Sequence, residues 1–215
     1  MAPASPLPRR LPPHGLYAIT DGPRGDLLAA AEAALQGGAA LLQYRDKTAD
    51  HARRLQEAAA LSALRARFDV PLIVNDDVEL ARESGAAGVH LGEDDPGIAQ
   101  ARKVLGPDAV IGVSCYDSLQ RARDAAAAGA DYLAFGAFFP SPTKPHARRA
   151  TPELLHQARA LGKPLVAIGG ITIDNGALLV EAGADFLAVV SAVFGAPDIR
   201  AAASAFAGLF TRHEP

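Results

Sequence analysis

Two aspartates, Asp76 and Asp95, each follow a short apolar run of the chain, and carboxylates are the ligands that Mg²⁺ prefers. Lys144 closes a hydroxyl-bearing turn after a third apolar run, where an ammonium group can pair with phosphate. Carboxylates for a divalent cation, together with cationic and hydroxyl groups for phosphate, predict a site for a phosphorylated substrate and Mg²⁺.

A second group, Gln43, Arg45 and Lys47, follows another apolar run. In an extended strand these three side chains share one face, because side chains alternate with a period of two. We expect them to bind an anion, with Arg45 gripping a phosphate through two parallel hydrogen bonds and Lys47 supplying a point charge. The alternative is that they are surface charges at the end of a barrel.

Aspartates at strand-to-helix turns also cap helices, and this alternative suits Asp77 and Asp94 better than Asp76 and Asp95. As a pair on adjacent loops, Asp76 and Asp95 favour magnesium, and zinc is not expected because no clustered His and Cys ligands appear. His90 lies inside an apolar run and is interpreted as a buried, hydrogen-bonded histidine rather than a ligand.

Three further run ends carry small or hydroxyl side chains. Ser114 can donate to a phosphate, whereas Cys115 beside it has no indicated base and is not expected to be a nucleophile. Gly169 and Gly170 end one run and Ser191 follows another, which matches the phosphate cradle common in barrels. The alternative is that the glycines only form a turn.

The apolar runs that precede these residues are short, evenly spread and bounded by Gly or Asp. They cover residues 16–20, 40–44, 71–74, 88–91, 110–114, 132–135, 164–168 and 186–190. Such runs are typical of strands buried on both faces of a parallel sheet. Between them lie Ala/Leu/Arg/Glu-rich segments of helical length, such as residues 50–67 and 118–128.

A repeated joint connects these segments, since Gly37, Gly85, Gly129 and Gly183 each follow a predicted helix and open a strand. Glycine suits the left-handed residue that ends many helices. Eight repeated βα units predict one (β/α)8 TIM barrel, with its active site at the carboxyl ends of the strands.

Composition narrows the class of protein. The net charge of −3 gives no general attraction to nucleic acid or membrane, and no apolar run approaches the ~20 residues needed to span a bilayer. A single cysteine favours a reducing, cytoplasmic location. We expect residues 1–14 to be a disordered Pro/Arg-rich tail and residues 15–215 to be one catalytic domain, and the sequence leaves a homo-oligomer open.

The ordered motifs resemble those of the thiamine-phosphate synthase family from about Gly15 to the C-terminal helix. The residues that carry the resemblance are 43–47, Asn75, Asp76, 90–95, 112–114, 140–144, 168–171, Val190 and Ser191. The resemblance implies a Mg²⁺-dependent TIM-barrel transferase. It would join 4-amino-2-methyl-5-hydroxymethylpyrimidine diphosphate to 4-methyl-5-(2-phosphoethyl)-thiazole.

The resemblance also implies roles for individual residues. The pyrimidine diphosphate would be held by Gln43, Arg45, Lys47, Asn75, Ser114 and Lys144, of which Arg45, Lys47, Ser114 and Lys144 would be catalytic. Mg²⁺ would be held by Asp76 and Asp95. The thiazole phosphate would be held by Ser141, Pro142, Thr143, Gly170, Val190 and Ser191. In the family mechanism diphosphate leaves first, and the thiazole nitrogen captures the resulting cation.

The chain departs from the family pattern at three positions. Tyr116 stands where many members have His, Glu93 replaces a common Gln, and Ser141 replaces a common Thr. Two other functions stay open. One is a thiazole tautomerase of the same barrel family, whose chemistry resembles proton transfer by a histidine at the position of Tyr116. The other is a non-catalytic barrel that binds thiamine intermediates. The retained Asp76 and Asp95 favour the synthase.

Overall fold

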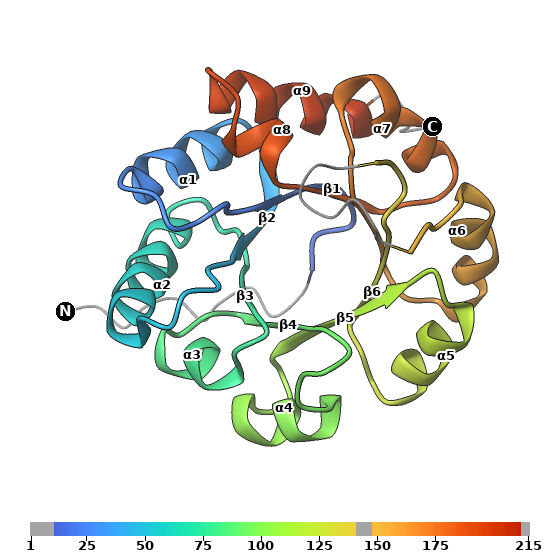
Figure 1. Ribbon diagram of the computed structural model, residues 1–215, viewed down its shortest axis with the longest axis horizontal. Coiled ribbons are helices and arrows are strands. Elements are labelled where there is room, and N and C mark those ends of the chain that lie inside the picture. The colour runs from blue at the N-terminus through green and yellow to red at the C-terminus, as the bar shows by residue number, and fades with distance from the viewer. Residues whose placement is uncertain (1–10, 141–147, 212–215) are drawn as a thin grey trace.

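The computed structural model describes residues 11–140 and 148–211, whose strands form one closed parallel barrel (Figure 1). The strands are β1 (Gly15–Ile19), β2 (Ala39–Tyr44), β3 (Leu72–Asn75), β4 (Gly88–Leu91), β5 (Val110–Tyr116), β6 (Tyr132–Phe135), β7 (Leu165–Ile168) and β8 (Phe186–Val189). Each pairs with the next along the chain, and β8 pairs with β1. The predicted barrel is confirmed, with strand ends within two residues of those expected.

Helices alternate with the strands and surround the barrel (Figure 1). They are α1 (Leu27–Gln36), α2 (His51–Arg65), α3 (Val78–Glu83), α4 (Ile98–Leu105), α5 (Leu119–Ala127), α6 (Pro152–Ala158) with the 3₁₀ turn η1 (Arg159–Leu161), α7 (Ile173–Glu181), α8 (Ser191–Phe194) and α9 (Ile199–Thr211). The short α8 is inserted between β8 and α9.

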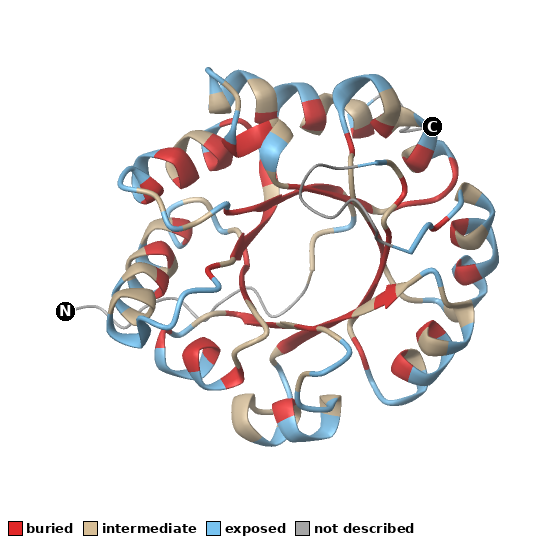
Figure 2. Ribbon diagram, viewed as in Figure 1, coloured by how far each residue is buried: buried red, intermediate tan, exposed pale blue. Residues whose placement is uncertain are grey.

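Two apolar layers hold this arrangement together. Side chains on the outer face of the strands pack against the helices, and Figure 2 shows the buried residues concentrated on the barrel wall and on the inward sides of the helices. The inner layer includes Tyr17, Ile73, Tyr132 and Phe186, all buried. The barrel interior is therefore a packed core, and in this fold the ligand site lies at the carboxyl ends of the strands.

The predicted glycine joints are confirmed at three of four positions. Gly85, Gly129 and Gly183 have φ of +67°, +93° and +102°, the left-handed region that glycine adopts without strain. At the first joint the prediction was wrong by one residue. Gly37 has φ −78° and ψ 0°, outside the left-handed region, and Gly38 takes the left-handed conformation with φ +91°.

At two of the joints, an aspartate makes a pair of hydrogen bonds with the backbone of a neighbouring strand. The carboxylate of Asp131 accepts a hydrogen bond from the Ile111 N–H (2.7 Å), and the Asp131 N–H donates to the Ile111 carbonyl (2.7 Å). Asp185 makes the same pair of bonds with Leu165, each at 2.8 Å. The sequence echo around residues 129–131 and 183–185 therefore corresponds to a repeated contact that fixes the start of a neighbouring strand.

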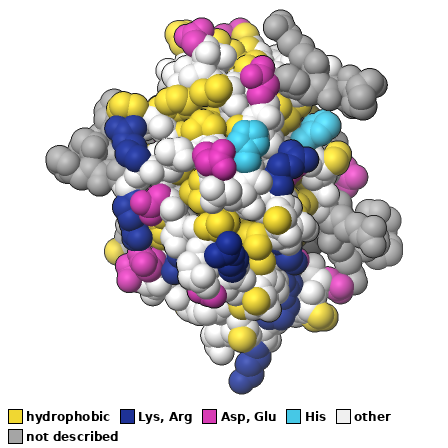
Figure 3. Space-filling view, turned by 90° about the vertical axis from the view of Figure 1, so that its right-hand side faces the viewer, with side chains coloured by type: hydrophobic (Ala, Val, Ile, Leu, Met, Phe, Trp, Pro, Cys, Tyr) yellow, Lys and Arg dark blue, Asp and Glu magenta, His cyan; other side chains and the backbone are white. Residues whose placement is uncertain are grey.

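Of the predicted tail, residues 11–14 are described: Leu11 packs against the inner layer, and the His14 ring stacks on Phe210 with centroids 5.6 Å apart. The side of the barrel seen in Figure 3 carries acidic and basic side chains interspersed with hydrophobic ones over its described part. Within residues 11–140 and 148–211, no helix is long and apolar enough to cross a membrane.

Candidate active site

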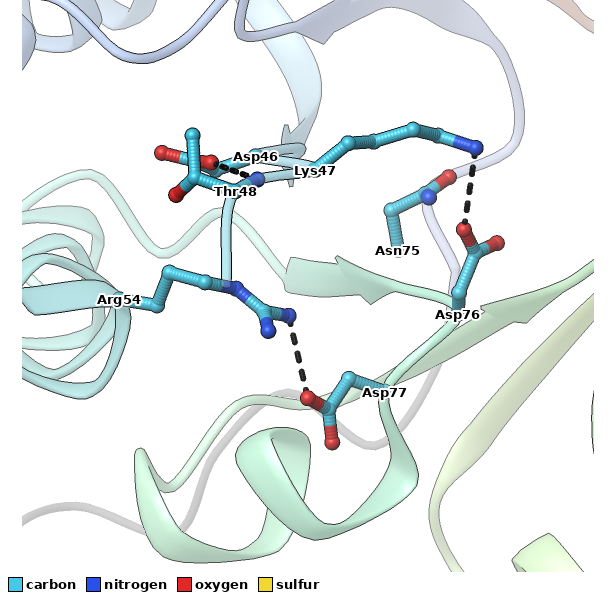
Figure 4. Close-up of a pocket in the computed structure, with 7 residues that line it drawn as sticks. All are labelled: Asp46, Lys47, Thr48, Arg54, Asn75, Asp76 and Asp77. Atoms are coloured by element: carbon cyan, nitrogen blue, oxygen red, sulfur yellow. Dashed lines mark hydrogen bonds and ion pairs between the residues drawn. The ribbon is translucent and has the colours of Figure 1, made fainter. Parts of the chain in front are cut away.

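A pocket opens at the carboxyl ends of β2 and β3, where the loops to α2 and α3 meet (Figure 4). Its volume is about 380 Å³, and it is lined by Asp46, Lys47, Thr48, Arg54, Asn75, Asp76 and Asp77. Lys47 reaches across the opening to Asp76, with Nζ 3.5 Å from Oδ2. Three of the predicted site residues, Lys47, Asn75 and Asp76, thus line one pocket.

Asp76 and Asp95 converge, as their positions on adjacent loops predicted. Burial raises the pKa of Asp95, and the neighbouring Asp76 carboxylate adds to the rise, while Lys47 opposes it. Two carboxylates that repel each other favour either a shared proton or a bound cation. The pair therefore offers negative charge and oxygen donors of the kind that a divalent metal binds.

Local backbone geometry aims these two carboxylates. Asp76 has φ +65°, a left-handed conformation that aspartate tolerates better than most residues, and its N–H donates to the His90 carbonyl at 2.8 Å. Asp95 folds back on its own loop, where its Oδ2 accepts from the Gly92 N–H at 2.5 Å. Hydrogen bonds thus hold the backbone of Asp76 and the side chain of Asp95 in place.

The prediction that Gln43, Arg45 and Lys47 share one strand face is wrong, because β2 ends at Tyr44. Asp46 turns the chain out of the strand: its buried carboxylate accepts from the Thr48 N–H and from Arg53, both at 2.7 Å. Gln43 consequently points into the barrel, Arg45 is half-buried in the loop, and Lys47 is exposed at the pocket.

The helix-capping alternative holds for one aspartate and not for the other. Asp77 is the N-cap of α3, accepting from the Leu80 N–H at 2.9 Å, and it also pairs with Arg54 at 3.1 Å. Asp94 is not a cap, because α4 begins after Gly97, three residues further on. The loop from β4 to α4 is longer than the capping interpretation assumed.

His90 is hydrogen-bonded inside the barrel, as the sequence indicated. Its Nδ1 lies 2.9 Å from the Tyr132 hydroxyl, and its Nε2 lies 2.9 Å from the Ser114 Oγ. Burial lowers the pKa of His90 to about 4, so the ring is neutral at pH 7. Ser114 lies two residues before the end of β5 and is half-buried.

Cys115 and Tyr116 follow Ser114 with different surroundings. Burial raises the pKa of the Cys115 thiol to about 12, which is consistent with the prediction that it is not a nucleophile. Tyr116 has φ +55°, unusual for a bulky residue, and its ring lies 4.4 Å from the Arg148 guanidinium carbon. Arg148 also pairs with Glu93 at 2.5 Å. Two departures from the family pattern, Glu93 and Tyr116, are therefore connected through one arginine.

The residues predicted to form a phosphate cradle follow β7 and β8. Gly170 has φ +66°, and a Cβ there would lie 2.5 Å from the Pro140 carbonyl oxygen and 2.7 Å from that of Phe139. The glycine is thus needed for close packing against the loop after β6. Val190 precedes α8, and Ser191 is the first, exposed residue of that short helix. Ser141, Pro142, Thr143 and Lys144 lie outside the described residues.

Sequence reasoning missed two residues at the bottom of this site. Tyr17 and Tyr132 place their hydroxyls 2.8 Å apart in the barrel interior, and the Gln43 amide nitrogen donates to Tyr17 at 2.7 Å. The alternation of side chains along each strand could have predicted them, because it places both tyrosines on the inward face of the barrel. A hydroxyl inside an apolar barrel needs a partner, and that requirement predicts a polar cluster.

Comparison with known proteins agrees with this geometry. A family model described as thiamine monophosphate synthase matches residues 16–193. The chain is 57% identical over 201 residues to a thiamine-phosphate synthase of Thiobacillus denitrificans, covering 92% of this chain and 95% of the relative. It is 58% identical over 199 residues to one of Azoarcus sp., covering 91% and 97%.

A solved structure shows the same likeness in three dimensions. The thiamine phosphate pyrophosphorylase of Pyrococcus furiosus superposes with a TM-score of 0.84 at 35% identity, over 92% of this chain and 96% of that one. The motifs at the strand ends, the barrel that presents them and these relatives agree, and the chain belongs to the thiamine monophosphate synthase family.

Proposed function

We propose that this chain is a thiamine-phosphate synthase, a transferase that joins 4-amino-2-methyl-5-hydroxymethylpyrimidine diphosphate to 4-methyl-5-(2-phosphoethyl)-thiazole and releases diphosphate. The observation that carries the proposal is the meeting of Asp76, Asp95 and Lys47 at the ends of neighbouring strands. Two carboxylates and an ammonium group at this end of a barrel suit a diphosphate bridged by a metal ion. Membership of the family supports the same reaction.

Mg²⁺ fits the donor set, and Asp76 and Asp95 would hold it. The described part of the chain gathers no group of three or more His, Cys, Asp or Glu side chains. Diphosphate oxygens and water would therefore complete the coordination, which is the usual arrangement for Mg²⁺. When bound, the ion neutralises negative charge on the leaving diphosphate.

The chain's own residues would divide the pyrimidine substrate between them. Lys47 and Asn75 line the pocket, and Arg45 lies in the same loop just before Asp46. These three residues would hold the diphosphate by charge and hydrogen bonds. Gln43, buried in β2, and Ser114, half-buried in β5, would contact the ring. Lys144 would stabilise the departing charge.

A dissociative reaction suits this inventory, because none of the described site residues is arranged as a base or nucleophile. Cys115 is protonated at neutral pH, and both ring nitrogens of His90 are engaged. We propose that the bond from the pyrimidine methylene carbon to the diphosphate oxygen breaks first. The thiazole nitrogen then donates its electron pair to that carbon, which needs no proton transfer from the protein.

The thiazole phosphate would bind beside α8. Gly170, Val190 and Ser191 lie at the ends of β7 and β8, and the short helix after β8 is the usual phosphate position in TIM barrels. Ser141, Pro142 and Thr143 would complete this pocket from the loop after β6.

The test is an assay of purified protein with both substrates, measuring diphosphate release and thiamine phosphate formation. Release should require both substrates and Mg²⁺. A tautomerase would instead convert a thiazole carboxylate phosphate without releasing diphosphate, and a non-catalytic barrel would bind without turnover. Tyr116 stands where a tautomerase would need its proton-carrying histidine, which weighs against that alternative.

Three features of the wider organisation stay proposals. They are a tail of residues 1–14 before one catalytic domain of residues 15–215, a cytoplasmic location, and a homo-oligomeric state. Limited proteolysis, cell fractionation and light scattering would test them in turn.

A further inference from the structure

A continuous chain of hydrogen bonds crosses the barrel interior and joins the two residues proposed to contact the pyrimidine ring. The Gln43 Nε2 donates to the Tyr17 hydroxyl at 2.7 Å, which lies 2.8 Å from the Tyr132 hydroxyl. That hydroxyl lies 2.9 Å from His90 Nδ1, and His90 Nε2 lies 2.9 Å from Ser114 Oγ. The five residues come from β2, β1, β6, β4 and β5.

Packing holds the three rings of this chain in place. His90 stacks on Tyr132 with centroids 5.6 Å apart and planes 15° apart, and Tyr17 meets Tyr132 edge-on at 5.9 Å and 88°. Gly112 on β5 leaves room for the Tyr132 ring, because a Cβ at that position would lie 1.8 Å from Cζ. Tyr17, Tyr132 and Gln43 are 1%, 0% and 2% exposed, so water does not compete for these bonds.

All hydrogen bonds of this series run in one direction, from Gln43 toward Ser114. The Gln43 nitrogen can only donate, so Tyr17 accepts from it and directs its own proton to Tyr132. Tyr132 then donates to His90 Nδ1, and the neutral ring carries its single proton on Nε2. His90 Nε2–H donates to the Ser114 oxygen. The hydroxyl proton of Ser114 is left free to point away from the chain.

We propose that Tyr17, Tyr132 and His90 are positioning residues that fix Ser114 as a hydrogen-bond donor to the pyrimidine ring and fix the amide of Gln43 at its other end. The identity of the substrate rests on the proposed function above. Ser114 would donate to a ring nitrogen. Gln43 keeps one N–H and its carbonyl oxygen, which match an exocyclic amino group beside a ring nitrogen.

This arrangement selects a 4-aminopyrimidine over a 4-oxopyrimidine. Exchanging the amino group for a carbonyl reverses the donor and acceptor pattern of that ring edge, and a pre-oriented Gln43 cannot turn without losing its bond to Tyr17. Tyr17 and Tyr132 therefore act on specificity without touching the substrate.

The first experiment reads the direction of the chain in ligand-free protein. ¹⁵N NMR of histidine-labelled protein distinguishes the two neutral tautomers of His90, whose signal among the six histidines is assigned by its loss in His90→Asn. The expected result is a proton on Nε2. A proton on Nδ1 would overturn the proposal, because Ser114 would then have to donate into the barrel.

The second experiment compares Tyr132→Phe with Tyr44→Phe, a matched control. Tyr44 also lies buried on a strand, but its hydroxyl donates outward to Glu57 at 2.7 Å. Tyr132→Phe should lose the single-tautomer signature of His90 and raise the KM for the pyrimidine diphosphate roughly tenfold, the effect of one weakened hydrogen bond. The KM for thiazole phosphate should not change, and Tyr44→Phe should match the parent protein in both measurements.

Equal kinetics in Tyr132→Phe and Tyr44→Phe would refute the positioning role. Failure of the proposed function would give a different result. Wild-type protein would then release no diphosphate, while the tautomer of His90 would still report the direction of the hydrogen-bond chain. Only the identity of the substrate would then be refuted.

Discussion

Replacing Asp95 with asparagine should change the protein's stability and its activity in opposite directions. Asparagine keeps an oxygen that accepts from the Gly92 N–H, so the loop retains its internal bond. It removes the repulsion with Asp76 that contributes to the raised pKa of Asp95. For a half-buried pair the gain is about 0.5–1 kcal/mol, which corresponds to a Tm rise of about 1–4 °C without metal.

The pH dependence of that gain follows from the sign of the pKa shift. Because the folded-state pKa of Asp95 is raised, ionisation of this carboxyl weakens the wild-type fold as pH rises through that value. The advantage of Asp95→Asn should therefore be present at neutral pH and fade in acid, where Asp95 is protonated. Thermal melts at matched ionic strength from acid to neutral pH would measure it.

Activity should fall in the same variant, because one of two carboxylates that hold Mg²⁺ loses its charge. We expect kcat/KM to drop roughly 10²–10³-fold, the usual effect of removing one preorganised electrostatic contact. Diphosphate release across a Mg²⁺ series measures this, with the exposed neighbour Asp94→Asn as control. Near-normal turnover of Asp95→Asn at low Mg²⁺ would refute the metal assignment, and a Tm drop of several degrees would refute the repulsion argument.

Three further predictions address the leaving group, the barrel interior and the thiol. Lys144→Ala should lower kcat by about 100-fold or more in single-turnover assays with a smaller change in affinity for the pyrimidine diphosphate, and the opposite pattern would assign Lys144 to ground-state binding. Gly112→Ala should lower the free energy of unfolding by about 1–3 kcal/mol or more in urea, because its Cβ would overlap the Tyr132 ring, whereas Gly208→Ala in α9 meets open space and should not destabilise. Cys115 should resist alkylation in the folded protein at pH 7 and react once unfolded, and rapid labelling of the native thiol would contradict its burial.

The sequence was sufficient for the barrel and for part of the site. Short apolar runs predicted the eight strands, because a strand buried on both faces is apolar along its whole length and can be recognised without knowledge of its partners. The convergence of Asp76 and Asp95 followed from strand order alone. The place where β2 ends was not predictable in this way, since it depends on Asp46 accepting hydrogen bonds from Thr48 and Arg53.

Contacts between distant segments account for the rest. Tyr17 and Tyr132 are 115 positions apart, and only closure of the barrel brings their hydroxyls together. The left-handed conformation of Tyr116 likewise follows from irregular pairing between β5 and β6 and from the nearby Arg148, not from the residue's own preference. Local propensity carries no information about either arrangement.

The twin joints at Asp131 and Asp185 suggest that the barrel is assembled from interchangeable pieces. In both, the aspartate lies 20 positions after the residue that it holds, and in both it closes the end of the barrel opposite to the site. Because the spacing and the backbone contacts are the same, a strand–helix–strand segment that ends at one of these joints would have compatible ends at the other. Recombination between related barrels at these two places would exchange catalytic loops while leaving the strand register untouched. The loops at the carboxyl ends of the strands can thus change while the joints at the amino ends keep the strands in the same register.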